Sequence, residues 1–379
     1  MSGFFNKKSN VLQFFALKIM AGLLCFCMLF LGVINPISLK TTETLSCNKV
    51  AEATFPSFQK IIKTLFKKEE KKEPATQKNY VYLGGFPLGF TISCSGVVVI
   101  AISNENVINL KEGDIIKKIE GTDISSAAEI SKLINSEGFK SGELELVIDR
   151  KGTEELAKLT PQIDSVTGKK KLGIWIRDNS AGVGTVTYIR KDNFRFGALG
   201  HPVCDIDTGA IMPVSSGNIF KCNIVGYKKG EKGSPGELKG LFLRNGSILG
   251  SLDKNNEFGV YGNFHEKYLE KLNTEVVEVA GKNEVKSGKA QIRCTIDGSE
   301  PAFYDIEIVK TYFQSQKSNK SMFIRVTDKR LLESTGGIVQ GMSGSPIIQN
   351  GKLVGAVTHV FVSDPTKGYG VYADWMLDN

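Results

Sequence analysis

Short segments with the apolar pattern of β-strands begin near residue 80 and continue to the end of the chain. Residues 97–102 and 144–148 are rich in β-branched side chains, and residues 115–119 place apolar residues around paired lysines. Such runs are typical of short, partly buried strands. Residues 126–134 instead have helical spacing, with a serine and an acidic residue suited to a capped N-terminus. Strands around one helix predict a small α+β domain over residues 80–163.

The second half of the chain, residues 170–379, has many short strand patterns and few long helical periods. Glycine, lysine and asparagine clusters separate the strands, as at residues 227–236. This pattern predicts a β-barrel or sandwich, so the expected fold is mainly β. The expected strands are residues 172–177, 183–189, 290–296, 304–309 and 322–326.

The N-terminal region has the pattern of an export signal or a membrane anchor. Residues 19–34 carry no charge, lysines precede them, and no acidic residue occurs before Glu43. We therefore expect a signal or anchor helix within residues 1–36 and a lysine-rich linker over residues 37–79. The positive flank stays in the cytoplasm, so the rest of the chain crosses the membrane. The sequence does not decide whether this segment anchors the protein in the membrane or is removed by cleavage.

The charge distribution argues against a nucleic-acid-binding protein. The chain of 379 residues is 41% hydrophobic and 23% charged, with a net charge of +8. Residues 1–80 contain 12 lysines and 5 glutamates, so +7 lies there and +1 in the remainder. The folded part is nearly neutral, and no nucleic-acid partner is expected.

The cysteine and histidine content predicts no cofactor. Seven scattered cysteines do not form a disulfide framework, and a content of three histidines argues against a multi-histidine metal site. A site from His201, Asp205 and Asp207 would need a further ligand that the spacing does not supply. Cys204 is interpreted as a packing residue, because nothing nearby would lower its pKa.

Ser343 is the candidate nucleophile of a hydrolase. It lies between Gly341 and Gly344, whose small size lets the chain bend so that backbone N–H groups face a developing oxyanion. We assign the oxyanion hole to Gly341 and Ser343. Ser345 is the weaker alternative because it precedes a proline. His201, in a second glycine-rich segment, would be the general base.

The carboxylate that would orient His201 is not determined by spacing. Asp205, Asp207, Asp328 and Asp364 all lie near one of the two segments. Asp328 ends an apolar strand 15 residues before Ser343, and it equally suits the N-cap of a short helix over residues 329–333.

The other two histidines have simpler interpretations. We expect His265 to lie on a surface helix, and His359 either to line the site or to pack beside it.

The α+β segment resembles a PDZ domain. The resemblance rests on Pro87-Leu88-Gly89-Phe90, on Gly113-Asp114-Ile115-Ile116 at the start of a strand, and on the helix that follows. It implies a peptide-binding loop at Leu88, Gly89 and Phe90, whose backbone N–H groups would hold a terminal carboxylate beside a free strand edge. The alternative is a β-rich domain that binds nothing.

The whole chain resembles the stage IV sporulation protein B peptidases of endospore-forming bacteria. The residues that carry this resemblance are GALGHPVCDIDTG and QGMSGSPIIQNGKLVGAVTHVFVSDPTKGYGVYADWML. It implies a chymotrypsin-like β-barrel serine peptidase over residues 170–379, with catalytic His201, Asp328 and Ser343.

The same resemblance implies a role in sporulation signalling. Members of the family are exported from the forespore to the space between the two membranes. They cleave themselves and a regulator of the intramembrane metalloprotease that processes pro-sigma-K. The expected partners are thus a protein substrate, the enzyme itself and the membrane. A membrane-tethered PDZ scaffold with an inert peptidase domain is the alternative.

Overall fold

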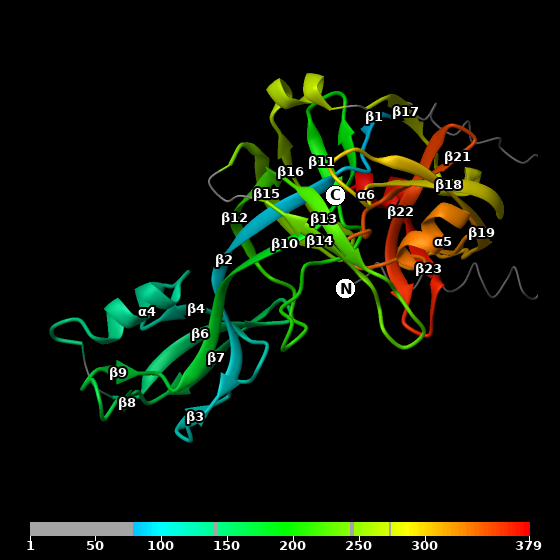
Figure 1. The fold of residues 1–379 in the computed structure, drawn as a ribbon. Helices are drawn as coiled ribbons and strands as arrows, with labels where there is room; N and C mark the ends of the chain where they lie inside the picture. Colours follow the sequence, from blue (N-terminus) through cyan, green and yellow to red (C-terminus); the bar gives the residue numbers. More distant parts are fainter. Residues whose placement is uncertain (1–78, 140–141, 243–245, 273) are drawn as a thin grey trace, which may run out of the picture. The chain divides into compact units, whose positions relative to one another are not determined.

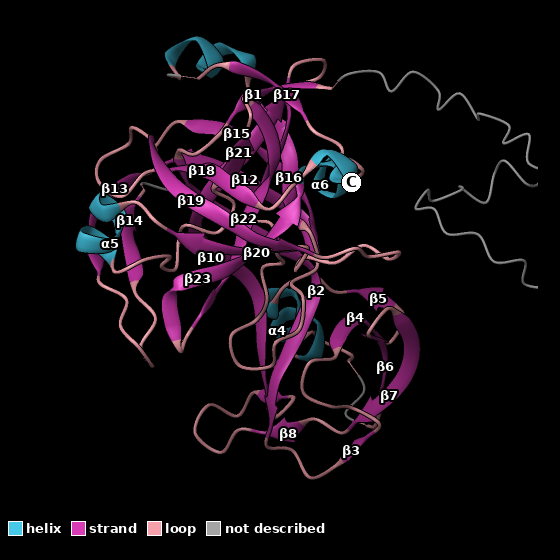
Figure 2. Cartoon of the chain, turned by 90° about the vertical axis from the view of Figure 1, so that its right-hand side faces the viewer, coloured by secondary structure: helices cyan, strands magenta, loops and turns pink. Residues whose placement is uncertain are grey.

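The computed structural model describes residues 79–139, 142–242, 246–272 and 274–379, and it is mainly β (Figure 2). Within these ranges no helix is long and apolar enough to cross a membrane. The expected anchor helix and linker lie outside the described residues. The helices among the described residues are α4 (Ala127–Ile134), α5 (Lys329–Thr335), α6 (Ala373–Leu377) and the 3₁₀-helices η1 (Glu266–Lys271) and η2 (Lys282–Glu284).

The strands up to residue 190 contribute to several hydrophobic clusters. They are β1 (Tyr80–Leu83), β2 (Pro87–Ile102), β3 (Val107–Ile108), β4 (Ile115–Ile119), β5 (Thr122–Asp123), β6 (Leu144–Arg150), β7 (Thr153–Leu159), β8 (Gln162–Ile163), β9 (Lys170–Lys171) and β10 (Ile174–Arg190). The later strands, up to η2, are β11 (Arg195–Ala198), β12 (Val214–Lys221), β13 (Asn223–Lys228), β14 (Glu237–Leu241), β15 (Ile248–Asn256), β16 (Gly259–Phe264) and β17 (Val276–Val279). The remainder are β18 (Gly288–Cys294), β19 (Ala302–Thr311), β20 (Met322–Val326), β21 (Pro346–Gln349), β22 (Lys352–Phe361) and β23 (Asp364–Tyr372).

One core belongs to the part of the chain around α4, which we call the α4 module (residues 95–177; Figure 1). Buried Ile130 and Ile134, one turn apart on α4, pack with buried residues of β4, β6 and β7. The predicted helix is confirmed, because Ser126 caps it and Glu129 completes a capping box.

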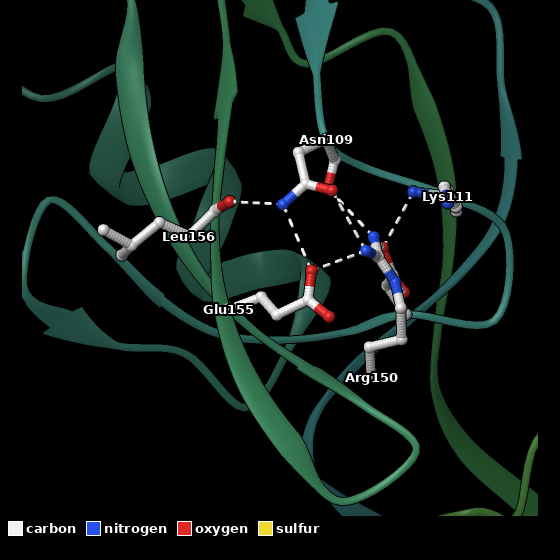
Figure 3. A network of polar contacts seen from close by, with 6 residues as sticks. Asn109, Lys111, Arg150, Glu155 and Leu156 are labelled. Atoms are coloured by element: carbon white, nitrogen blue, oxygen red, sulfur yellow. Dashed lines mark hydrogen bonds and ion pairs between the residues drawn. The ribbon is translucent and has the colours of Figure 1, made fainter.

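A buried ion pair fixes the loop that precedes β4. Asp114 is 2% exposed, and Arg150 binds both of its oxygens, with distances of 2.8 Å from Nε and 2.6 Å from Nη2. Arg150 also contacts Glu155 and the Asn109 side chain (Figure 3). A bidentate guanidinium satisfies the buried carboxylate that would otherwise be costly. The Gly113-Asp114 segment therefore has a structural role.

The long strands β2 and β10 run through both parts of the chain, which the sequence did not predict. Their outer halves pair in the α4 module, as at Ile174 with Ile102, and their inner halves pair in the remaining β region, as at Gly182 with Phe90. A register shift between Arg177 and Asn179 separates the halves. The α4 module thus begins near residue 95 and ends near residue 177, whereas residues 80–163 were expected.

This pairing also corrects the predicted peptide-binding loop. Leu88, Gly89 and Phe90 lie inside β2, paired with β10 on one side and with β12 on the other. Leu88 is fully buried and Phe90 is 4% exposed. Since both strand edges are occupied by ladder pairing, these residues do not form a loop that could hold a carboxylate.

The remaining β region, residues 80–94 and 178–379, has two hydrophobic clusters. One is built mainly from β2, β10, β11, β12, β15 and β16, and the other mainly from β18 to β23 with α6. The predicted hairpin is confirmed: Asn350 and Gly351, with φ of 53° and 75°, join β21 to β22. The segment containing His201 follows β11, and the turn containing Ser343 precedes β21, so each cluster supplies one candidate residue.

Candidate active site

His201 and Ser343 line the same cavity, which has a volume of about 500 Å³. His359 of β22 and Phe90 of β2 line it as well. Much of the rest of its surface is apolar, from Val183, Leu199, Ile338, Val339 and Val360. Two residues separated by more than 140 positions are thus brought to one concave site, which is what a nucleophile and its base require.

Two threonines of β10 hold the Ser343 turn. The Thr185 hydroxyl donates to the Gly341 carbonyl at 2.8 Å, and the Thr187 hydroxyl donates to the Gly344 carbonyl at 2.7 Å. Gly344 has a φ of 93°, and a Cβ there would lie 2.2 Å from the Thr185 carbonyl oxygen. Only glycine allows this close approach, so the turn is held rigidly against β10.

The same turn has two backbone donors without a partner in the described part of the chain, and both of their residues line the cavity. Within the described residues, the N–H groups of Gly341 and Ser343 make no hydrogen bond with the protein, although those of Met342, Gly344 and Ser345 do. Gly341 has a φ of 95°, a conformation that glycine adopts readily. Two free N–H groups beside a serine can stabilise the oxyanion of an acyl-transfer reaction.

The two serines of the turn have different environments. The Ser343 hydroxyl is partly exposed and donates to the Thr358 carbonyl at 2.9 Å. Ser345 is fully buried, and its hydroxyl donates to the Met342 carbonyl at 2.6 Å. Ser343 is therefore the serine that a substrate can reach.

The His201 segment is held from two sides. The Leu199 N–H donates to the Thr185 carbonyl, and the Asn255 side chain pairs with both the N–H and the carbonyl of Val203. His201 Nδ1 lies 2.8 Å from the Pro202 carbonyl oxygen. A proton on Nδ1 satisfies this contact, so we assign the lone pair to Nε2.

The environment of His201 favours the neutral ring. Burial lowers its pKa below the ordinary value near 6.5, and the Pro202 carbonyl opposes part of this shift. The neutral imidazole can therefore accept a proton at neutral pH, which is what a general base must do.

Asp328 does not meet His201. Its carboxylate caps α5 by accepting from the Arg330 N–H at 2.9 Å, and it also accepts from the Asp305 N–H and from the Arg330 guanidinium. Arg330 is the main reason that its pKa is lowered to about 2. Asp328 does not line the cavity. In the structure Asp328 is therefore the N-cap of α5. This differs from the role in a catalytic triad that the resemblance implied.

The other candidate carboxylates are also engaged elsewhere. Asp205 and Asp207 pair with Arg177, and Asp205 also holds the turn before Thr208. Asp364 accepts from Thr366 and pairs with Lys367. None of the described residues that line the cavity is an aspartate or a glutamate.

Neither a cysteine nucleophile nor a metal site is evident in the described part of the chain. Burial, followed by Asp205, raises the pKa of the Cys204 thiol, which disfavours the thiolate. No group of three or more potential ligands that could hold a metal occurs among the described residues. His265 is exposed, as expected, but it precedes the 3₁₀-helix η1 and does not lie on a helix.

A second concave surface lies on the α4 module. It has a volume of about 380 Å³ and lies between α4 and the start of β10, with Ile130, Ile134, Leu172, Ile174 and Ile176 in its lining. Residues 174–177 pair with β2 on one side, and no other described strand pairs with them. An apolar groove beside a free strand edge suits the binding of an extended peptide.

Leu172-Gly173-Ile174 is the segment that leads into this groove. It repeats the Leu-Gly-apolar triplet found at Leu88-Gly89-Phe90, and Gly173 has a φ of 67°. The sequence therefore contains two copies of this signal, at residues 88–90 and 172–174. Sequence reasoning also missed Thr185, Thr187 and Asn255, although the two threonines lie two positions apart on one strand face, as such a role requires.

Comparison of the sequence with models of known protein families identifies a peptidase family. The model of the family described as SpoIVB peptidase S55 matches residues 168–377, more than half of the chain. The protein is thus a peptidase by class. The chain belongs to the SpoIVB peptidase S55 family.

Solved structures with some similarity include a PDZ domain and a protease. The PDZ domain of the SdrC-like protein from Listeria monocytogenes is 26% identical, covering 22% of this chain and 90% of that chain, with a TM-score of 0.19. The active form of the Rv3671c protease from M. tuberculosis is 15% identical, covering 52% of this chain and 72% of that chain, with a TM-score of 0.29. A comparison with curated proteins found no match.

Proposed function

We propose that this protein is a serine endopeptidase in which Ser343 is the nucleophile and His201 is the general base. The observation that carries the proposal is the shared cavity, in which Ser343, His201 and two unpaired backbone N–H groups come together. The region that holds them, with its two hydrophobic clusters, would be a chymotrypsin-like double barrel, and the α4 module would be a PDZ domain.

The chemistry follows from these positions. Ser343 Oγ attacks the substrate carbonyl carbon while its proton passes to Nε2 of His201. The oxyanion that forms is stabilised by the N–H groups of Gly341 and Ser343. The scissile C–N bond then breaks, and His201 returns the proton to the leaving amine. Because Ser343 donates to the Thr358 carbonyl in the free protein, its side chain must turn toward His201 before attack.

Family membership supports a role in sporulation signalling. In that role the enzyme is exported from the forespore, is held by its N-terminal segment or released after cleavage, and acts between the two membranes. It cleaves itself and a regulator of the intramembrane protease that activates pro-sigma-K. No nucleic acid or cofactor takes part.

The test of this proposal is N-terminal trimming of the full chain. We expect the wild type to shorten itself and the Ser343→Ala variant to stay intact, since alanine has no hydroxyl to attack a peptide bond. Ser345→Ala is a demanding control, because that hydroxyl lies in the same turn but is buried. Equal trimming of the wild type and Ser343→Ala would contradict the proposal, and so would the absence of trimming in both.

The groove on the α4 module is expected to hold the end of a protein chain. Ser131 lines the groove on α4, whereas Lys132, the next residue, does not. We expect Ser131→Trp to fill the groove and to weaken binding of peptides with a free carboxylate and a terminal valine or leucine by at least about tenfold, which is 1.4 kcal/mol. Lys132→Trp should bind as the wild type does. Fluorescence anisotropy with labelled peptides measures both, and unchanged binding by Ser131→Trp would rule out this groove.

A further inference from the structure

A closed loop, residues 203–212, begins two positions after His201. Its two ends pair with each other, because the Met212 N–H donates to the Val203 carbonyl at 3.0 Å. Only Pro202, whose ring fixes its own φ, separates this loop from His201. A change in the direction of the 203–212 loop therefore turns His201 as well.

The base of the 203–212 loop is held by Asn255 of β15. The side-chain amide bonds the N–H and the carbonyl of Val203 at 2.9 and 2.7 Å, and it also donates to the Met212 carbonyl at 2.9 Å. Val203 and Met212 pack with Val98 of β2 at the same end of the loop. These contacts fix where the loop begins, but a loop held at one end can still pivot about it.

The tip of the 203–212 loop is organised by Asp205, whose side chain is fully buried. Its Oδ1 accepts from the N–H groups of Asp207 and Thr208 at 3.1 and 2.9 Å, and from the Thr208 hydroxyl at 2.9 Å. Its Oδ2 accepts from the Arg177 guanidinium. Because a buried carboxylate is costly without a charged partner, the shape of the tip depends on Arg177.

Arg177 connects this tip to β10. Its Nη1 bonds Asp205, and its Nη2 bonds Asp207 at 2.9 Å, so one planar guanidinium bridges two carboxylates of the loop. The backbone of Arg177 is fixed by pairing with Val98 in β2. The loop is thus held at its base by Asn255 and at its tip by Arg177, and two separated points fix its direction.

The strand that carries Arg177 also holds the nucleophile. Thr185 and Thr187, further along β10, donate to carbonyls of the turn that contains Ser343. Figure 1 shows β10 running from the α4 module into the remaining β region. One strand therefore sets the Ser343 turn and the His201 segment relative to each other.

We propose that Arg177 is a positioning residue for the general base: through Asp205 and Asp207 it fixes the direction of the 203–212 loop, and with it the ring of His201. This inference rests on the function proposed above. Transfer of the Ser343 proton to His201 needs the two side chains within hydrogen-bond distance and correctly aligned. Arg177 does not line the cavity and takes no part in the proton transfer.

The test measures acylation of the full chain by a fluorophosphonate reagent over a range of reagent concentrations, which separates the maximal rate from the half-maximal concentration. Arg177→Met removes the charge and keeps most of the side-chain length, whereas Arg177→Lys keeps the charge and loses the planar fork. Arg190→Met is the matched control. Arg190 lies on the same strand, is 27% exposed against 34% for Arg177, and pairs with Asp192, outside the loop.

We expect Arg177→Met to lower the maximal rate by about 100-fold, the scale on which a small misplacement of a catalytic group acts. The half-maximal concentration should stay unchanged, because the apolar lining that meets the reagent lies on other segments. Arg177→Lys should fall between Arg177→Met and the wild type, and Arg190→Met should match the wild type. In a His201→Ala background, Arg177→Met should have no further effect, since the group that it positions is gone.

Three results would overturn the inference while the proposed function stands. The maximal rate of Arg177→Met could lie within about threefold of the wild type. Arg177→Met could slow acylation as much in the His201→Ala background, which would show that it does not act through His201. Arg190→Met could fall as far as Arg177→Met, which would indicate a general effect of removing charge from β10.

The lysine variant keeps the inference testable where Arg177→Met does not fold. Arg177→Lys retains a charge beside the buried Asp205, and a wild-type maximal rate in that variant would then overturn the inference. A wild type that is never acylated would instead contradict the proposed function, and the inference with it.

Discussion

Replacing His201 by alanine is expected to slow the acylation of Ser343 by about 10⁴-fold, the scale on which the loss of a triad member acts. The hydroxyl of Ser343 is a weak nucleophile unless a base removes its proton, and His201 lines the same cavity with an available lone pair on Nε2. A fluorophosphonate reagent measures this step directly, without knowledge of the physiological substrate.

The pH dependence of the wild-type acylation rate tests the role of His201 independently. Burial lowers the pKa of His201, so the base form is already populated below pH 6.5. The acylation rate should therefore rise with pH through a midpoint below 6.5 and then level off. His265→Ala is the control and should leave both rate and midpoint unchanged. A His201→Ala variant that is acylated at the wild-type rate would remove His201 from the mechanism.

Replacing Asp328 by asparagine is expected to cost about 2–3 kcal/mol of unfolding free energy at pH 7, from a lost cap interaction and lost charge-assisted hydrogen bonds. Asp328 connects three elements. The residue follows β20 in the chain, and its carboxylate caps α5 and accepts a hydrogen bond from the Asp305 N–H in β19. Its side chain is 6% exposed, so water does not replace these bonds. Chemical denaturation of the full chain measures the loss.

The sign of the pH effect follows from the lowered pKa. A carboxyl whose pKa falls to about 2 on folding contributes stability that is complete above the unfolded value near 3.9. That contribution is lost as the pH falls through the folded value. The difference between wild type and Asp328→Asn should thus be constant near neutrality and shrink in acid.

Two comparisons separate this structural role from a catalytic one. Asp364→Asn, at a half-exposed carboxyl bonded to Thr366 and Lys367, should cost less than about 1 kcal/mol. Folded Asp328→Asn should be acylated at a rate close to that of the wild type. An Asp328→Asn variant of unchanged stability, acylated orders of magnitude more slowly, would show that Asp328 serves His201 after all.

Local signals predicted much of this structure. The Ser126 and Glu129 pair is a complete start signal for α4, and Asn350-Gly351 supports the hairpin conformation without strain. Ser343 could be preferred over Ser345 because glycine spacing and the following proline are also local features. The structure places Ser343 in the cavity and Ser345 in the core.

Long-range pairing could not be predicted from the sequence. Leu88-Gly89-Phe90 and Leu172-Gly173-Ile174 are equivalent as local patterns, and only the pairing of β2 with both β10 and β12 shows that the first is a core strand. The carboxylate partner of His201 could not be predicted from the sequence for the same reason. Each aspartate had a suitable position in the sequence, but the reach of a side chain depends on the strands around it. The contact between His201 and His359 joins residues 158 positions apart, and no local pattern marks it.

Whether Ser343 is a nucleophile activated by His201 can be decided by locating the bond that a fluorophosphonate forms with the full chain. Mass spectrometry of the digested protein identifies the modified residue. We expect one adduct, on Ser343, that forms in the wild type and is nearly absent in His201→Ala over the same time. An adduct on Ser345 or on any other residue, or no adduct in the wild type, would contradict it.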